Sequence, residues 1–165
     1  MDSLGTASAE RLRAVFGRFA TGVAVMTTMD ACARPVGVTA NSFTSLSLDP
    51  PLVLWCLRLL SGSLRAFTSA DFFAVNVLSV EQEQLARRFA APIGDRFAAV
   101  SWHGHSQGPP VLSGAVATLV CRRVQEIHGG DHVIVIGRVE DFDMTSSPPL
   151  VFLDGHYQTP VLAPG

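Results

Sequence analysis

Lysine is absent from this sequence of 165 residues, in which arginine supplies all twelve basic side chains. Schiff-base or general-base chemistry by a lysine amine is therefore excluded, while guanidinium groups remain available to bind phosphate. An excess of positive charge is also lacking, since fourteen acidic residues give a formal net charge of −2. Nucleic-acid-binding proteins usually carry a basic stripe, so we expect no nucleic-acid partner.

The sequence has few cysteines, and their spacing follows no common motif. Cys32, Cys56 and Cys121 form an odd set without CxxC spacing, which disfavours both a disulfide framework and a structural zinc site. His128 and His132 have the i, i+4 spacing of helical metal ligands, but Gly129 and Gly130 between them disfavour a helix. We expect no bound metal and a reducing, cytoplasmic compartment.

Long apolar runs are missing as well. No segment reaches the roughly 18 apolar residues of a membrane span, and the start of the sequence lacks the pattern of a signal peptide. We expect no membrane association. The chain is 48% hydrophobic and only 16% charged, which predicts one domain over residues 1–165 with a large core and a subunit interface, most simply in a homodimer.

The periodicity of the sequence predicts a mainly β fold with few helices. An amphipathic helix is expected around Leu12 to Phe19, and shorter helices over 61–69 and 81–89. The expected strands cover residues 23–28, 36–38, 52–57, 72–78, 115–124 and 132–142, with a turn at Gly129-Gly130. Short strands joined by hairpin-length loops favour a closed or nearly closed antiparallel barrel, Greek-key-like, with flanking helices.

Two familiar nucleotide-binding motifs do not occur, since the sequence has neither G-x-G-x-x-G after a strand nor a P-loop. A nicotinamide cofactor would have to bind by other means. Residues 104–108 match the G-x-S-x-G of a hydrolase, but Pro109 and Pro110 disfavour the helix that must follow the serine. We interpret this segment as a loop.

A hydroxyl-rich segment from Thr39 to Asp49 leads directly into an apolar strand. Short polar side chains and backbone amides beside apolar surface could hold the flat, polar-edged ring of a flavin. A capped turn or surface hairpin is the alternative.

Ser61-Gly62-Ser63 stands ahead of a predicted helix and could receive a phosphate, with Arg87 or Arg88 adding a guanidinium. As an alternative, this segment is a plain N-cap.

Blocks of residues along nearly the whole chain resemble the flavin reductase domain family, whose fold is the FMN-binding split barrel. In chain order these blocks are Phe19-Ala20-Thr21-Gly22-Val23, Thr39-Ala40-Asn41-Ser42-Phe43-Thr44-Ser45, Asp49-Pro50-Pro51-Leu52-Val53, Phe73-Ala74-Val75-Asn76-Val77-Leu78, Asp95-Arg96-Phe97 and Gly130-Asp131-His132. The resemblance implies a small homodimeric NAD(P)H:flavin oxidoreductase that supplies reduced FAD or FMN to a flavin-dependent monooxygenase.

The same resemblance implies the positions of the site. The residues expected to contact the flavin are Thr39, Ala40, Asn41, Ser42, Phe43, Ser45, Leu46, Ser47 and Cys56. The residues expected near its phosphate are Ser61, Ser63, Arg88 and Phe89. His132 and Tyr157 match residues that contact the nicotinamide, and His132 is the residue we expect to take part in catalysis; as an alternative, His132 caps the turn after Gly130.

Hydride transfer from nicotinamide C4 to flavin N5 needs the two rings about 3–3.5 Å apart, so positioning supplies most of the acceleration. The cofactor carries the chemistry.

The sequence does not decide whether FAD or FMN is the preferred flavin, or whether NADH or NADPH is the preferred hydride donor. It also leaves open a flavin- or haem-binding module without turnover, whereas a pyridoxamine-phosphate oxidase type of barrel is less attractive because lysine is absent.

Overall fold

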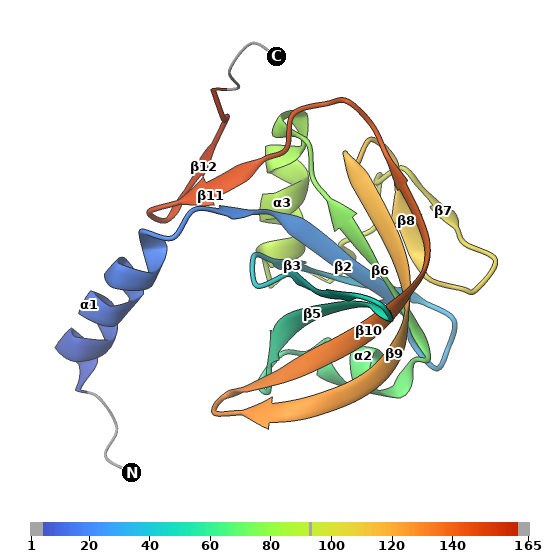
Figure 1. The fold of residues 1–165 in the computed structure, drawn as a ribbon, viewed down its shortest axis with the longest axis horizontal. Coiled ribbons are helices and arrows are strands. Elements are labelled where there is room, and N and C mark those ends of the chain that lie inside the picture. Colours follow the sequence, from blue (N-terminus) through green and yellow to red (C-terminus); the bar gives the residue numbers. More distant parts are fainter. Residues whose placement is uncertain (1–4, 93, 162–165) are drawn as a thin grey trace.

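The computed structural model describes residues 5–92 and 94–161. A seven-stranded antiparallel sheet, with the strand order β3-β2-β6-β9-β10-β5-β4, forms the body of the molecule (Figure 1). Its strands are β2 (Ala24–Met29), β3 (Pro35–Ala40), β4 (Thr44–Leu48), β5 (Pro51–Arg58), β6 (Phe72–Val77), β9 (Ala117–Gly129) and β10 (His132–Met144). The mainly β, antiparallel prediction is confirmed.

Two smaller sheets and the helices surround this body. The three-stranded sheet comprises β1 (Thr21–Gly22), β11 (Val151–Leu153) and β12 (His156–Gln158), and the two-stranded sheet comprises β7 (Trp102–Gly104) and β8 (Pro110–Leu112). The helices are α1 (Thr6–Gly17), α2 (Leu64–Ser69), the 3-10 turn η1 (Val80–Gln82) and α3 (Glu83–Ala90). Among the described residues, no helix has the length and apolar character needed to cross a membrane.

The inward side chains of the curled sheet build the main core. Along β5 the burial alternates, so that Val53, Trp55 and Leu57 point inward, as expected for a strand with one buried face. Helix α2 closes one end of the barrel, where Phe67 packs edge-to-face on Trp55 with ring centroids 4.9 Å apart. Burial of Phe67 explains why so short a helix is stable.

A second core lies between the sheet and α3. Phe89 of α3 is fully buried and meets Phe97 edge-to-face at 5.0 Å between ring centroids. Gly37 of β3 makes this close approach possible, because a Cβ there would lie 2.5 Å from Phe89 Cε1. The helix therefore lies almost directly on the β3 backbone, and its residues are fixed relative to that strand.

The segment 39–49 contains a strand that was not among those predicted, and this strand forms a hairpin with β5, in line with the surface hairpin given as an alternative. Only residues 41–43 cross between strands, and Thr44 to Leu48 continue as β4, paired antiparallel with β5 and with a register shift between Ser45 and Ser47. Most of these side chains are exposed, so burial does not hold the strand. The ladder to β5 stabilises it, and a pairing between strands leaves no periodic signal in the sequence.

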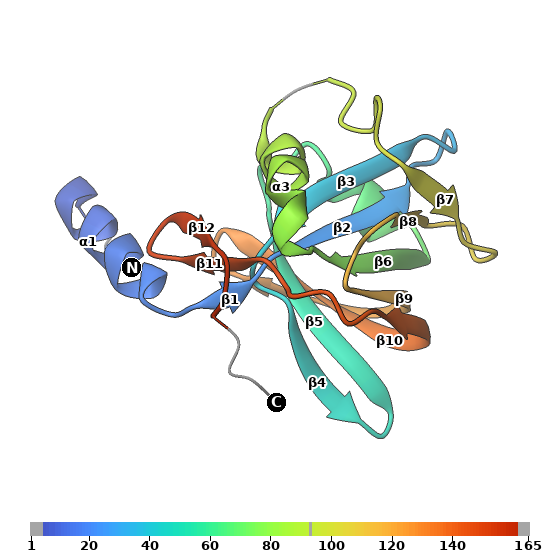
Figure 2. The ribbon, with the colours of Figure 1, turned by 90° about the horizontal axis from the view of Figure 1, so that it is seen from above.

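The predicted N-terminal helix is present as α1, which ends at Gly17, and its apolar face has no partner among the residues that the structure describes. Figures 1 and 2 show it standing away from the barrel beyond the small sheet of β1, β11 and β12. Val15, Phe16 and Phe19 are 60%, 67% and 78% exposed. A helix of this kind is typical of an interface with another molecule.

Candidate active site

Strands β3 and β5 approach each other although β3 is an edge strand of the sheet. Predicted flavin residues lie along these two strands and the crossing from β3 to β4, and we call this region the groove. Ser42, in the crossing between β3 and β4, fastens the two sides. Its Oγ accepts a hydrogen bond from the Cys56 backbone N–H at 2.9 Å and donates one to the Cys56 carbonyl at 3.2 Å. Both hydrogen bonds of this hydroxyl go to the Cys56 backbone, so they hold the crossing between β3 and β4 against β5.

At one end of the groove, predicted flavin and nicotinamide residues meet. Thr39, Ala40, Asn41 and Tyr157 line one small cavity of about 140 Å³. The Thr39 hydroxyl is already engaged, since it donates to the Ala86 carbonyl in α3 at 2.7 Å. Asn41 is exposed, so its amide is available to a ligand at this end of the groove.

The sequence did not indicate the other members of this cavity, Val23, Ala90 and Phe152. Phe152 packs on the Tyr157 ring with centroids 5.3 Å apart. Both lie on the short paired strands β11 and β12, where Phe152 is directly opposite Tyr157. Strands of three residues carry too little pattern to be predicted, so nothing local marked Phe152.

The Tyr157 ring also makes a cation–π contact. The Arg87 guanidinium carbon lies 4.9 Å from the ring centroid, and Glu83 holds the same guanidinium in an ion pair at 2.7 Å. Burial raises the pKa of the Tyr157 phenol, with Glu83 adding to the rise and Arg87 opposing it. The phenol is therefore neutral at physiological pH, and its O–H can donate a hydrogen bond.

His132 begins β10 directly opposite Arg58, two residues along β5 from Cys56. It therefore lies at the end of β5, about 7 Å along the strand from the Ser42 bridge. Its Nδ1 is 2.7 Å from Asp131 Oδ1, and this contact lowers the pKa of the Asp131 carboxyl. The carboxylate orients the ring, while the cavity that Tyr157 lines does not include His132.

The predicted phosphate residues are only partly assembled. Ser61 Oγ accepts a hydrogen bond from the Ser63 N–H at 3.2 Å, and Ser63 is buried. Helix α2 begins at Leu64 and not at Ser61 as predicted, because Ser61 to Ser63 form the turn that leaves β5. Ser63 therefore occupies the N-cap position of α2, the alternative that the sequence left open, although its side chain makes no capping hydrogen bond.

Arg88 and Phe89 face away from this turn. The Arg88 guanidinium donates to the backbone carbonyls of Arg96 and Asp95, at 2.7 and 3.3 Å, and so holds the loop after α3. The Phe89 ring lies in the second core with no exposed surface. The helical pattern of the sequence places both residues on α3, but it does not predict which residues each side chain contacts.

Ser45, Leu46 and Ser47 lie on β4, the edge strand next to β5. Phe43 and Cys56 are half-buried near Ser42, and Phe43 packs against the main core. The arrangement combines an apolar wall, an exposed amide and hydroxyls, which fits a flat heteroaromatic ring with a polar edge. No carboxylate pair or nucleophile–base pair is found among the predicted site residues.

Two alternative motifs take structural roles. Gly104 ends β7, and Ser106 lies in the turn of the β7–β8 hairpin, which confirms the interpretation of the G-x-S-x-G match as a loop. His128 pairs with Val133 across the β9–β10 hairpin, so it does not share a helix face with His132.

Residues 16–160 match the model of the flavin reductase like domain. The chain belongs to this family. The match spans the groove, both sides of the Ser42 bridge and Tyr157, so the family's resemblance predicted from the sequence is confirmed over nearly the whole chain.

Solved and curated relatives support the same assignment. The NADH:FAD oxidoreductase of Streptomyces globisporus, solved with NAD and FAD fragments, is 38% identical with a TM-score of 0.89, covering 99% of this chain and 98% of that one. The stachydrine N-demethylase reductase subunit Stc3 of Rhizobium meliloti is 43% identical over 92% of this chain. The reductase component of the flavin-dependent trigonelline monooxygenase of Acinetobacter baylyi is 41% identical over 90% of it.

The chain spans 66% and 48% of the lengths of these two curated relatives. The split-barrel fold of the family is confirmed, including the flanking helices.

Proposed function

We propose that the chain is an NAD(P)H-dependent flavin reductase that supplies reduced FAD or FMN to a separate flavin-dependent monooxygenase. The observation that carries this proposal is the likeness to the Streptomyces globisporus NADH:FAD oxidoreductase, which extends over almost the full length of both chains. The groove adds chemical support, because its residues suit a flavin and include no group for hydrolysis. The names of the two curated relatives point to a monooxygenase partner.

Within this proposal, different residues of the groove contact different parts of the flavin. Phe43 and Cys56 offer apolar contact to the flat ring, and Asn41 offers hydrogen bonds to its polar edge. Ser61 and Ser63, at the other end of the groove, offer hydroxyls to the phosphate. Ser45 to Ser47 border the ring from β4, while Arg88 and Phe89 support the site from behind by fixing α3 and its following loop.

A bound flavin supplies the acceptor for a hydride from the nicotinamide, and the protein contributes orientation. Tyr157, held by Phe152 and Arg87, gives the nicotinamide a fixed aromatic wall beside Thr39 to Asn41. His132, whose Nδ1 contacts Asp131, is the proposed donor, through Nε2, to the nicotinamide or its phosphates. None of these residues needs to act as a strong acid or base.

We propose that the protein works as a homodimer in the cytoplasm, as a single domain over 1–165. The exposed apolar face of α1 supports the dimer. The free thiols of Cys32, Cys56 and Cys121 support a reducing compartment.

The activity is tested by following NADH absorbance with FMN or FAD added to the purified protein. We expect turnover that depends on both flavin and nicotinamide, and the same assay with NADPH gives the preference between the nicotinamides. Flavin binding without NADH oxidation would instead identify a binding module, and neither binding nor oxidation would contradict the proposal.

The role of His132 is tested with His132→Ala. We expect the KM for NADH to rise about tenfold, the loss of roughly one hydrogen bond to a charged group, with the Kd for flavin within twofold of the parent. His128→Ala is the matched control, because His128 is exposed on the other strand of the same hairpin. Unchanged NADH kinetics in His132→Ala would remove the assignment.

A further inference from the structure

Helix α3 contacts both walls of the small cavity that Thr39 and Tyr157 line. On one side, the Ala86 carbonyl accepts a hydrogen bond from the Thr39 hydroxyl of β3 at 2.7 Å. On the other side, the guanidinium carbon of the next residue, Arg87, lies 4.9 Å from the centroid of the Tyr157 ring. Ala90, one helical turn after Ala86, lines the cavity itself. One short helix therefore joins a strand of the predicted flavin site to the residue predicted to contact the nicotinamide.

The sequence offered Arg87 as a guanidinium for the flavin phosphate, but the structure engages it with a carboxylate and an aromatic ring. Its Nε donates to Glu83 Oε1 at 2.9 Å, and its Nη2 lies 2.7 Å from the same oxygen. The spacing of four residues places the two side chains on one face of the helix. A planar guanidinium can stack on the face of an aromatic ring, so Glu83 holds this cation over Tyr157.

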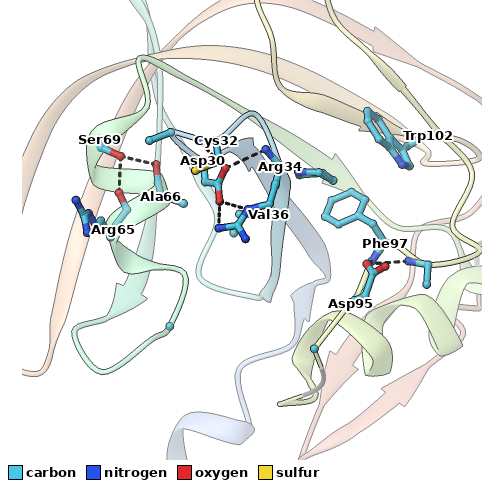
Figure 3. A pocket seen from close by; sticks show the side chains of 15 residues that line it. Asp30, Cys32, Arg34, Val36, Arg65, Ala66, Ser69, Asp95, Phe97 and Trp102 are labelled. Atoms are coloured by element: carbon cyan, nitrogen blue, oxygen red, sulfur yellow. Dashed lines mark hydrogen bonds and ion pairs between the residues drawn. The ribbon is translucent and has the colours of Figure 1, made fainter.

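Helix α3 is itself fastened to the body of the protein. Figure 3 shows Asp95 and Phe97 on the segment that follows the helix, where the Asp95 carboxylate accepts from the Phe97 N–H group at 3.0 Å. The Phe97 ring packs on Phe89 of α3, and the Arg88 guanidinium donates to the Asp95 carbonyl at 3.3 Å. Gly37 lets the helix lie close to the β3 backbone. With these contacts, α3 can fix the position of a side chain that packs on it.

The backbone around Tyr157 gives its ring little support. The residue lies on β12, a strand of three residues at the end of the small sheet, paired with β11. Its ring packs on Phe152, but Phe152 belongs to the same hairpin and would move with it. The contact with Arg87 is the one that ties the ring to α3. The orientation of Tyr157 relative to Thr39 is therefore set through Arg87.

We propose that Arg87, held by Glu83, is a positioning residue for hydride transfer, because it fixes the ring of Tyr157 on α3. The Thr39 hydroxyl positions the flavin strand on the same helix, so α3 sets the separation of the two rings. In this step the C4–H bond of NADH breaks and its hydride bonds to flavin N5, so that NADH is oxidised and the flavin is reduced. The rate depends on a ring separation of about 3–3.5 Å. The inference rests on the proposed function and deepens it.

The main test measures single-turnover reduction of bound flavin by NADH, followed by flavin absorbance. We expect Arg87→Ala to lower the rate constant about tenfold, since small displacements of reacting atoms are costly, and to raise the KM for NADH about fivefold. The Kd for flavin should stay within twofold of the parent. Arg87→Lys should restore most of the rate, because an ammonium can also lie over the ring. Gln84→Ala, an exposed neighbour on α3, is the matched control.

A second test examines the Thr39 hydroxyl with two variants of similar size. Thr39→Val removes the donor to the Ala86 carbonyl, and Thr39→Ser keeps it. We expect Thr39→Val to lower the rate of hydride transfer at saturating flavin about tenfold, with the Kd for flavin within about threefold, and Thr39→Ser to restore the rate. A large rise in the Kd for flavin with an unchanged rate would make this hydroxyl a flavin ligand and overturn its positioning role.

Tyrosinate absorbance of the flavin-free protein reports the contact between Arg87 and Tyr157 without turnover, and so separates the two proposals. We expect the midpoint to rise in Arg87→Ala and to stay near the parent value in Arg87→Lys. If Arg87→Ala shifts the midpoint but reduces flavin as fast as the parent, or if Gln84→Ala slows reduction equally, the inference is overturned and the proposed function stands. If the parent itself reduces no flavin, the proposed function fails and the inference fails with it.

Discussion

Tyr157 is the single tyrosine of the chain, so its ionisation can be read directly from tyrosinate absorbance. Burial raises its pKa above 10.0, and the Arg87 charge opposes that rise. We expect a higher midpoint in the native protein than in denaturant. Arg87→Ala should raise the native midpoint further, because it removes the cation that stabilises the phenolate.

The same titration tests the geometry of the Tyr157 cavity. The contact between Arg87 and the Tyr157 ring depends on the Glu83 ion pair, so Glu83→Gln should loosen it. A native midpoint equal to that in denaturant, or one that falls in Arg87→Ala, would mean that Tyr157 is not packed under Arg87.

The three thiols differ in burial, which predicts an order of reactivity toward an aromatic disulfide reagent at pH 8. Cys32 is exposed, Cys56 is half-buried and Cys121 is buried. Burial, with a smaller contribution from Glu140, raises the pKa of Cys121 to about 12. We expect Cys32 to react first and Cys121 only after unfolding, since the thiolate is the reacting form. Early labelling of Cys121 would contradict its position in the core.

The raised pKa of Cys121 also affects stability in alkali. Its folded value of about 12 lies above the ordinary value of 9.0, so the unfolded chain releases this proton first. The contribution is fully present below pH 9 and is lost as the pH rises toward 12. Cys121→Ala should therefore lose less stability than the parent between these pH values, as measured by urea unfolding.

At the scale of elements, the packing of α3 on β3 depends on Gly37. Its missing Cβ leaves room for Phe89, which would otherwise be 2.5 Å away. Gly37→Ala should lower the free energy of unfolding by about 2 kcal/mol, as overpacked cores do. Gly104→Ala is the control, because its Cβ would meet nothing within 4 Å, and it should change stability by less than about 0.5 kcal/mol. Equal effects would show that α3 is not packed as described.

The elements that the sequence predicted are those with their own local signal. The β2–β3 hairpin has an apolar strand ending at a turn, and the β9–β10 hairpin has Gly130 at a positive φ of 63°. Strand β4 was missed because the ladder to β5, far more than its own residues, stabilises it. The same limit applies to β11 and β12, and it is why Phe152 was missed.

The sequence predicted contacts between side chains of the site only where their positions along the chain decide these contacts. Thr39 to Asn41 and Tyr157 do meet in one cavity, although they are distant in sequence. The resemblance carried this information, because periodicity cannot join such segments. The direction of a helical side chain depends on packing against other elements, and so the contacts of Arg88 and Phe89 could not be derived from the sequence.

For the whole molecule, the exposed face of α1 is the main unburied apolar surface at the N-terminal side of the barrel. The apolar side chains on it and just after it are Leu12, Val15, Phe16 and Phe19, which are 37% to 78% exposed. Transferring such side chains from water to an interface stabilises association by about 1.5–3 kcal/mol each when burial is complete. A helix that projects from its own barrel can reach the barrel of a second copy.

We therefore expect light scattering to give twice the chain mass of 17.6 kDa for the parent and a monomer for the double variant Phe16→Ser and Phe19→Ser. Both side chains are exposed, so the barrel itself should keep its near-UV spectrum and its buried tryptophan emission. Leu60→Ser is the control, since Leu60 is 89% exposed on the turn before α2, at a distance in sequence from α1. A double variant that remains dimeric, or a parent that is monomeric at micromolar concentration, would show that this helix does not join two copies.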